Sequence, residues 1–365
     1  GLIKPDNEDS LLSLWAYCSS GEYSSSVREV DQALKVTNAT LGKIEFDHEL
    51  WLSVAKVKYP NGLPKIYTSD PTQWIYHGHP CGSVIWDEEK KWTVIADKRT
   101  DETVLQVAVA RLLGYRWPAE LDDEMELADE MLHWLGKSDD LLRLVDDDGI
   151  VCLPALRGER AAASRLEAML QAAYEEDWSS SVLSDLLASV GSKSLETWLR
   201  DKFFEQHCKL FQHRPFIWQI WDGLKDGFSV LVNYHKLNYQ GLERLIYTYL
   251  GDWIRTQEHG FKEGIDGAES RLMAAKNLKD SLEAILKGDA ITGKSGLDIF
   301  VRWKPLHEQP MGWNPDLNDG VRLNIRPFMQ APDVDKKGAG VLRTKPNIKW
   351  GKDRGNDVRS EEHTS

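Results

Sequence analysis

The sequence contains no long apolar run and few cysteines. No stretch approaches the roughly 20 consecutive apolar residues of a membrane-spanning helix, so we expect no membrane span. The four cysteines are widely separated and form no Cys-x-x-Cys pair: Cys18, Cys81, Cys152 and Cys208. A disulfide framework and a zinc ribbon are therefore not expected, and a reducing, cytoplasmic setting fits.

Two motifs of methyl-transferring enzymes are also missing. No Pro-Pro pair occurs, whereas amino-methylation of adenine usually needs an Asn or Asp followed by Pro-Pro and an aromatic residue. A methyl donor is usually held by a Gly-rich turn after a strand, and the one close match, Lys337-Gly-Ala-Gly340, has no helical pattern after it. We therefore assign no catalytic residue and no cofactor to this chain.

The composition is that of a folded protein with an acidic balance. Charged residues make up 28% and hydrophobic residues 41% of the 365 residues, a length typical of about two domains. The net charge of −13 excludes a basic coating of nucleic acid over the whole surface, but it permits a local basic face. The 15 tryptophans predict a large buried ring area.

Periodicity predicts mainly helices in the first two thirds of the chain. Residues 10–58 are expected to form helix, loop, short strand and helix, with Asp47 as the cap of the last helix. Turn formers fill residues 59–82, and residues 83–96 are typical of a hairpin. Residues 102–208 are mostly helical, with one apolar face in the first helix (Val104, Val107, Ala108, Arg111 and Leu112).

The stretch 120–148 holds twelve acids against Lys137 and Arg143. Such a block repels phosphate, so this face is expected to point away from nucleic acid, although each single acid also fits a solvated helix surface. At its end, Asp146-Asp147-Asp148-Gly149 lacks the alternating spacing and the closing Glu of an EF-hand loop, and we interpret it as a turn.

A second hairpin is predicted at residues 216–232, followed by two helical stripes at residues 242–253 and 272–286. The short Gly-rich link between the stripes predicts an antiparallel pair of long helices. At about 1.5 Å per residue, each helix is roughly 30 Å long, which suits a spacer.

Residues 297–357 differ from the rest because Lys and Arg outnumber the acids and tryptophans are interleaved. Lys and Arg can neutralise phosphates and Arg can reach base edges, so this tail is a candidate DNA contact. Lys and Arg interleaved with tryptophans are equally typical of a solvent-exposed basic surface that covers a small aromatic core. The residues that we assign to DNA binding are Arg302, Lys304, Arg322, Arg326, Lys345 and Lys349.

Two further groups of residues could carry chemistry. His77, His79 and Cys81 alternate and could converge on a metal ion, but no second ligand pair lies nearby, so a structural turn is preferred and no metal site is assigned. Cys208 follows His207 and could be an activated thiol, but its helical setting favours a small buried side chain.

Several strings resemble the C-terminal region of large adenine-specific DNA methyltransferases of type IIG-like restriction-modification and phage-defence systems, of the BREX and DISARM kind. The strings are Leu14-Trp-Ala-Tyr-Cys-Ser-Ser20, Val36-Thr-Asn-Ala-Thr40, Asp70-Pro-Thr-Gln-Trp74, residues 107–118, Arg214-Pro-Phe-Ile-Trp218, residues 231–237, residues 247–253 and residues 318–328. The likeness runs over most of residues 10–358.

The resemblance implies the recognition and spacer end of an enzyme that methylates the amino group of adenine in DNA. Its S-adenosylmethionine and catalytic motifs would lie on chain that precedes this region, so this part alone is expected to be inactive, and whether it is itself an enzyme stays open. The expected partners are double-stranded DNA and other defence-system proteins, with no membrane. A helical docking module that recruits such proteins without touching DNA is the alternative.

The resulting fold class is mainly α with short β hairpins (α+β): a helical spacer with an antiparallel pair of long helices. The predicted domains are a remnant of a target-recognition domain at residues 1–58 and a loop and hairpin connector at residues 59–101. They are followed by a helical domain with an acidic face at residues 102–210, a hairpin plus helix pair at residues 211–296, and a basic tail at residues 297–358. Residues 359–365, Arg-Ser-Glu-Glu-His-Thr-Ser, match the translation of a common sequencing adaptor, and we expect a non-native or disordered terminus there.

Overall fold

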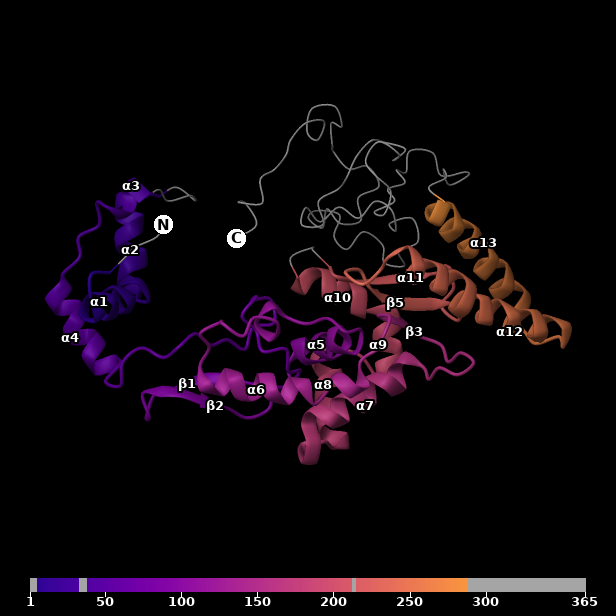
Figure 1. The fold of residues 1–365 in the computed structure, drawn as a ribbon, viewed down its shortest axis with the longest axis horizontal. Coiled ribbons are helices and arrows are strands. Elements are labelled where there is room, and N and C mark those ends of the chain that lie inside the picture. Colours follow the sequence, from indigo (N-terminus) through magenta and orange to yellow (C-terminus); the bar gives the residue numbers. More distant parts are fainter. Residues whose placement is uncertain (1–4, 33–37, 212–214, 288–365) are drawn as a thin grey trace, which may run out of the picture. The chain divides into compact units, whose positions relative to one another are not determined.

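The computed structural model describes residues 5–32, 38–211 and 215–287 (Figure 1). In these residues the chain is mainly helical with short antiparallel strands, which confirms the predicted fold class. The chain divides into two units, formed by Gly1–Ser69, Ser83–Asp97 and Glu124–His133, and by Asp70–Gly82, Lys98–Asp123 and Trp134–Ser365. None of the described helices is long and apolar enough to cross a membrane.

The first unit is built on two packed helices, α1 (Glu8–Cys18) and α4 (His48–Lys58). The Asp47 carboxylate accepts a hydrogen bond of 3.0 Å from the Leu50 backbone N–H, which confirms the predicted cap. Between these helices in the chain lie α2 (Gly21–Val30) and α3 (Asn38–Leu41). All elements in the described part of residues 5–58 are helices, and the predicted short strand is not among them.

The predicted hairpin of the first unit is confirmed as β1 (Val84–Asp87) and β2 (Trp92–Ile95), which pair antiparallel. One oxygen of Asp87 accepts hydrogen bonds from the backbone N–H groups of Glu89 and Lys90, at 2.8 and 2.9 Å. These bonds satisfy donors of the turn that no strand partner reaches, because an Asp side chain can replace backbone acceptors in a turn.

The core of the second unit forms around α5 (Glu102–Leu112), which contacts α7 (Ala162–Tyr174), α8 (Ser180–Ser189) and α10 (Phe203–Leu210). The sequence predicted one apolar face for α5, but every residue from Val104 to Leu112 is buried. A helix enclosed on all sides must also bury its polar residues, and Gln106 and Arg111 accordingly have partners inside the core.

Three antiparallel strands in the order β3–β5–β4 form the sheet of the second unit. The predicted second hairpin is confirmed as β4 (Ile217–Trp221) and β5 (Ser229–Asn233). The third strand, β3 (Ile150–Cys152), pairs with β5 and was not predicted. Three apolar residues are too short a run to separate a buried strand from a helix by periodicity alone.

The antiparallel helix pair is confirmed as α12 (Leu250–Lys262) and α13 (Ala268–Lys287), which lie side by side in Figure 1. The first of the two is not one regular helix, because α11 (Tyr239–Arg244) continues through a π-helical turn, η4 (Leu245–Tyr249), before α12 begins. The remaining elements are η1 (Pro118–Glu120), α6 (Asp129–Asp139), η2 (Leu142–Leu144), η3 (Glu175–Asp177) and α9 (Leu195–Asp201).

The basic tail, residues 297–358, and the terminus, residues 359–365, lie outside the described residues. The five domain boundaries drawn from the sequence stay predictions.

Candidate functional site at the start of β3

The six residues assigned to DNA binding, Arg302, Lys304, Arg322, Arg326, Lys345 and Lys349, all lie outside the described residues. Their assignment therefore stays a prediction.

The loop that carries His77, His79 and Cys81 is buried, with at most 2% of each residue exposed. Nδ1 of His77 accepts a 3.0 Å hydrogen bond from the His79 backbone N–H, and the Cys81 thiol lies 3.4 Å from the Ala173 carbonyl oxygen. Burial, with His79, Arg99 and Arg111 nearby, holds the pKa of His77 well below its usual value, and burial raises the pKa of Cys81 to about 12. These side chains serve the fold of the loop, and the described residues contain no group of three or more His, Cys, Asp and Glu placed to hold a metal ion.

His207 and Cys208 are also structural. Nδ1 of His207 lies 3.1 Å from the Gln106 side-chain oxygen, and Nε2 accepts a 3.2 Å hydrogen bond from the Ile217 backbone N–H. Burial lowers the pKa of His207 to about 3 and raises that of Cys208. The thiolate is the nucleophilic form of cysteine, so activation requires a base that takes the thiol proton. Both ring nitrogens of His207 are engaged with other groups, so the imidazole does not serve as that base.

A string with phosphate-loop spacing occurs at Gly288-Asp-Ala-Ile-Thr-Gly-Lys-Ser295. It lies outside the described residues, directly after α13, which runs to Lys287. A phosphate loop connects a strand to a helix, and here the preceding element is a helix. We therefore assign no nucleotide-binding role to this string.

A group of charged side chains surrounds Asp146, directly before β3. One oxygen of Asp146 accepts hydrogen bonds from the backbone N–H groups of Asp148, Gly149 and Ile150, at 3.1, 2.8 and 3.1 Å. The other oxygen lies 2.9 Å from Nη1 of Arg165, on α7. The predicted turn thus uses its first carboxylate to hold the start of the strand.

Asp148 connects the same turn to the helices after the sheet. Its Oδ2 accepts hydrogen bonds from Arg244 at 2.8 Å and from the Tyr249 hydroxyl at 3.0 Å, at the end of α11 and of η4. Nζ of Lys236 lies 3.3 Å from the Asp146 carbonyl oxygen. Segments almost 100 residues apart in the sequence therefore meet at this turn.

The two carboxylates have pKa values shifted in opposite directions. Burial, reinforced by the hydrogen bond with Asp148, raises the pKa of Asp146. Burial also acts to raise the pKa of Asp148, but hydrogen bonds from Asp146, Arg244 and Tyr249 outweigh it and lower that pKa. Opposite shifts in neighbouring carboxyl groups are typical of acid and base pairs, and also of structural ion-pair networks.

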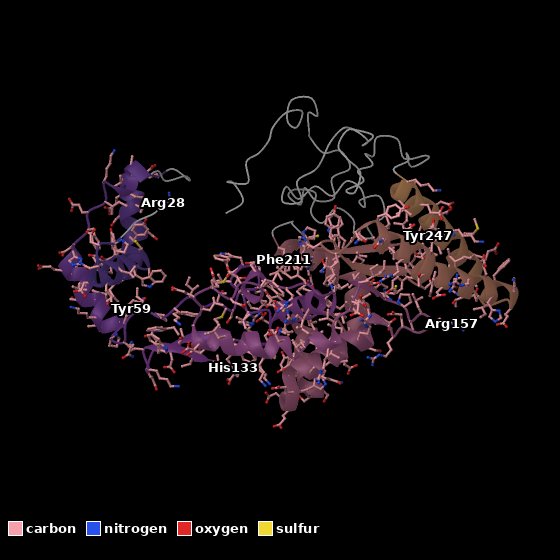
Figure 2. All side chains as sticks on the ribbon, in the orientation of Figure 1. Arg28, Tyr59, His133, Arg157, Phe211 and Tyr247 are labelled. Atoms are coloured by element: carbon pink, nitrogen blue, oxygen red, sulfur yellow. The ribbon has the colours of Figure 1, made fainter. Side chains whose placement is uncertain are left out.

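A cavity of about 320 Å³ lies against this cluster, lined by Val145, Asp146, Asp147, Gly158, Glu159, Arg160 and Arg165. Arg157, labelled in Figure 2, lies on the same loop between β3 and α7 as Glu159. Arg165 bridges Asp146 and Glu159, at 2.9 and 3.3 Å. The lining residues include no cysteine, serine or histidine, and the ion pairs of Arg165 hold the segments around the cavity together.

Sequence reasoning singled out Asp146, Asp147 and Asp148 but could not find their partners. Arg165, Lys236 and Arg244 are ordinary surface-type residues in the sequence, and only the fold brings them to the turn.

Similarity to known proteins is distant and points to adenine-specific methyltransferases. No family model matches the chain. The adenine-specific methyltransferase BrxX of Escherichia coli O9:H4 (strain HS) is 25% identical over 150 residues, which are 38% of this chain. The adenine-specific methyltransferase PglX of Lacticaseibacillus casei (strain Zhang) is 24% identical over 205 residues, which are 52% of this chain.

These alignments cover 11% of the first relative and 16% of the second. The chain therefore spans less than a fifth of the length of the curated relatives it matches.

Proposed function

We propose that this chain is the DNA-recognition and spacer part of an adenine-N6 DNA methyltransferase of a restriction-modification or phage-defence system. The observation that carries the proposal is the similarity to two adenine-specific methyltransferases from different organisms. The strings between residues 14 and 328 that resemble the C-terminal region of such enzymes support the same assignment.

The helix pair suits a spacer. α13 contains 20 residues and α12 packs along it, so the pair forms a stiff arm of roughly 30 Å at about 1.5 Å per residue. Leu272, Ala275, Leu278 and Leu282 of α13 are buried, which keeps the arm rigid. A recognition element attached to such an arm would stay at a fixed distance from the catalytic domain.

S-adenosylmethionine is the cofactor of the full-length protein in this proposal. The turn between β4 and β5 does not fit it. The turn after β4 contains two glycines, but the backbone N–H groups of Leu224 and Phe228 already donate to the Asp222 carboxylate, at 3.0 and 2.7 Å. Those donors are not available to a ligand, so no step of methyl transfer is assigned to this chain.

In the proposed complex, the basic tail binds the backbone of double-stranded DNA in the cytoplasm. Arg302, Lys304, Arg322, Arg326, Lys345 and Lys349 carry the positive charge that would neutralise phosphates. Each neutralised phosphate releases a counterion, so affinity falls steeply as salt rises.

The test is a salt titration of duplex binding by the full chain. Combined substitution of Arg322→Glu and Arg326→Glu should weaken binding and reduce the log–log salt slope by about 0.9 for each phosphate that is no longer neutralised. Lys193→Glu, an exposed cation before α9, is the matched control and should change little. Equal DNA retention by the double variant and by the parent would contradict the proposal.

The second candidate is a helical module that docks other defence-system proteins without touching DNA. The acidic stretch 120–148 favours it, because that surface repels phosphate. A pull-down with and without nuclease treatment distinguishes the two, since partners held through DNA are lost after digestion and directly docked partners remain.

A further inference from the structure

Trp74 is exposed over 61% of its surface, although it stands in a well-fixed loop of the second unit. Tryptophan carries the largest apolar side chain, so leaving it in water forgoes a large hydrophobic gain. An exposed tryptophan on a rigid backbone is the pattern of a binding hot spot, because little entropy is lost when a partner covers it.

Hydrogen bonds on both sides of Trp74 fix its backbone. The Pro71 carbonyl oxygen accepts a 2.8 Å bond from the indole N–H of Trp117, a residue that is itself buried. The Trp74 carbonyl oxygen accepts a 3.3 Å bond from the Ala119 backbone N–H. Before them, the Asp70 carboxylate accepts the Thr72 backbone N–H at 2.9 Å.

The same hydrogen bond to Ala119 places the segment that carries a second exposed apolar residue beside the Trp74 loop. Leu121 follows η1, two residues after Ala119, and is 66% exposed. Its backbone N–H donates to the Pro118 carbonyl oxygen at 2.9 Å, so its position is also fixed. Trp74 and Leu121 therefore form an apolar surface on two neighbouring segments, which we call the Trp74–Leu121 surface.

The charges around this surface are mainly negative. Asp70 lies four residues before Trp74, and the exposed Asp122 and Asp123 follow Leu121 directly. The nearby Arg116 is engaged with Glu120 and with Asp139, at 3.3 and 3.1 Å. Carboxylates therefore outnumber cations in the two segments that carry the surface, which disfavours phosphate and favours a cationic partner.

We propose that the Trp74–Leu121 surface binds a basic polypeptide segment that carries an aromatic or aliphatic anchor. The anchor covers Trp74 and Leu121, and the Lys and Arg residues of the segment lie against Asp70, Asp122 and Asp123. Residues 343–352 of this chain have the required composition, with four Lys or Arg, Ile348, Trp350 and no acid. The surface itself contains none of the residues assigned to DNA binding, whereas the segment at residues 343–352 includes two of them, Lys345 and Lys349. The test below measures peptide binding without DNA, so its outcome is separate from that of the proposed function.

The test uses a fluorescein-labelled peptide of residues 343–352 and the full chain in which Arg343, Lys345, Lys349 and Lys352 are changed to Gln. Those changes remove the charge contacts of the chain's own segment and so weaken its competition with the peptide. Fluorescence anisotropy should show binding that weakens between about 50 mM and about 500 mM salt, because exposed charges are screened. Adding Trp74→Ser should weaken binding at least about tenfold, as expected for a central aromatic contact.

Trp15→Ser is the matched control, because Trp15 is another exposed tryptophan, at 52%, on α1 of the first unit. It should leave the peptide affinity unchanged, and a thermal melt of each variant checks that the fold is intact. Trp74→Phe should restore most of the affinity lost in Trp74→Ser, since it keeps an aromatic anchor.

Three results would overturn the proposal. Equal affinity of the peptide for the Trp74→Ser variant and its parent would show that the surface is not the site. Duplex DNA that binds through Trp74 would show that the occupant is nucleic acid. Self-association of the parent chain that depends on Trp74 and resists the peptide would show that the occupant is a second copy.

Discussion

The guanidinium of Arg111 and the carboxylate of Glu120 form an ion pair whose side chains are 0% and 1% exposed. Nη2 of Arg111 also donates to the Ser138 carbonyl oxygen at 2.7 Å, and Glu120 accepts the Trp117 backbone N–H at 2.8 Å. Because the charge of Arg111 has left water, it depends on Glu120 for compensation, whereas Glu120 also pairs with Arg116 at 3.3 Å. This pair ties α5, η1 and the end of α6 together.

Removing one partner of this pair should be strongly destabilising. We expect Glu120→Ala to lower the free energy of unfolding by about 3–5 kcal/mol, because Arg111 would be left as a buried charge without compensation. Urea unfolding followed by tryptophan fluorescence measures the change. Asp201→Asn, which breaks the more exposed pair with Arg200, should cost less than about 1 kcal/mol. A similar loss of unfolding free energy in the two variants would contradict the burial of the Arg111–Glu120 pair.

Asp148→Asn should destabilise the protein at neutral pH, by about 1–3 kcal/mol, because its carboxylate accepts bonds from Arg244 and Tyr249. The folded pKa of Asp148 lies below its usual value of 3.8. Its stabilising contribution is therefore fully present above the unfolded pKa and is lost as pH falls through the folded pKa. The difference between variant and parent should shrink as pH drops below about 4.

Unfolding experiments at several pH values check this, with Asp147→Asn as the control. Asp147 is exposed and belongs to the same turn, so its substitution should change stability little at any pH. If Asp148→Asn lowers the free energy of unfolding by the same amount at neutral and at acidic pH, the ionised carboxylate is not the source of the stabilisation.

The four cysteines should differ sharply in reactivity. Cys18 is exposed, whereas Cys81, Cys152 and Cys208 are buried. Burial also raises the pKa values of the three buried thiols, and the thiolate is the reactive form. Titration with a thiol reagent should therefore modify one cysteine in the native chain and all four in denaturant. Fast modification of a Cys18→Ser variant in native buffer would contradict the buried placement.

Two glycines should respond oppositely to the same substitution. Gly136 lies inside α6, where an added Cβ would meet no atom within 4 Å, so Gly136→Ala should stabilise by about 0.5–1 kcal/mol. Gly149 has a φ of +73°, and a Cβ there would lie 3.2 Å from the Leu113 carbonyl oxygen. Gly149→Ala should therefore destabilise by more than about 1 kcal/mol. Thermal melts of both variants measure the change in melting temperature. Changes of the same sign in the two variants would refute the prediction.

Local patterns predicted the helices and strands but not how completely neighbouring elements bury them. The hairpins β1–β2 and β4–β5 follow from short apolar runs on either side of a polar turn, and the cap at Asp47 follows from its position before an apolar stripe. The one-faced interpretation of α5 underestimated its burial, because a helix in the centre of a unit contacts neighbours on every side. The π-helical turn in Leu245–Tyr249 has no local signal of this kind.

The candidate site shows the same limit. The acids of the turn at Asp146 are visible in the sequence, but Arg165 and Arg244 reach them from 19 and 96 residues away. The many tryptophans predicted a large buried ring area, but only the structure shows that Trp117 is buried and that Trp74, in the loop bonded to it, is 61% exposed.

The sequence by itself determined the helices, the two hairpins and the uneven distribution of charge, because each depends on residues close together along the chain. The tertiary structure alone decided which charges are buried in pairs and which aromatic rings face the solvent. Those outcomes depend on how distant segments pack, and a short window of sequence contains no information about which distant segment will cover it.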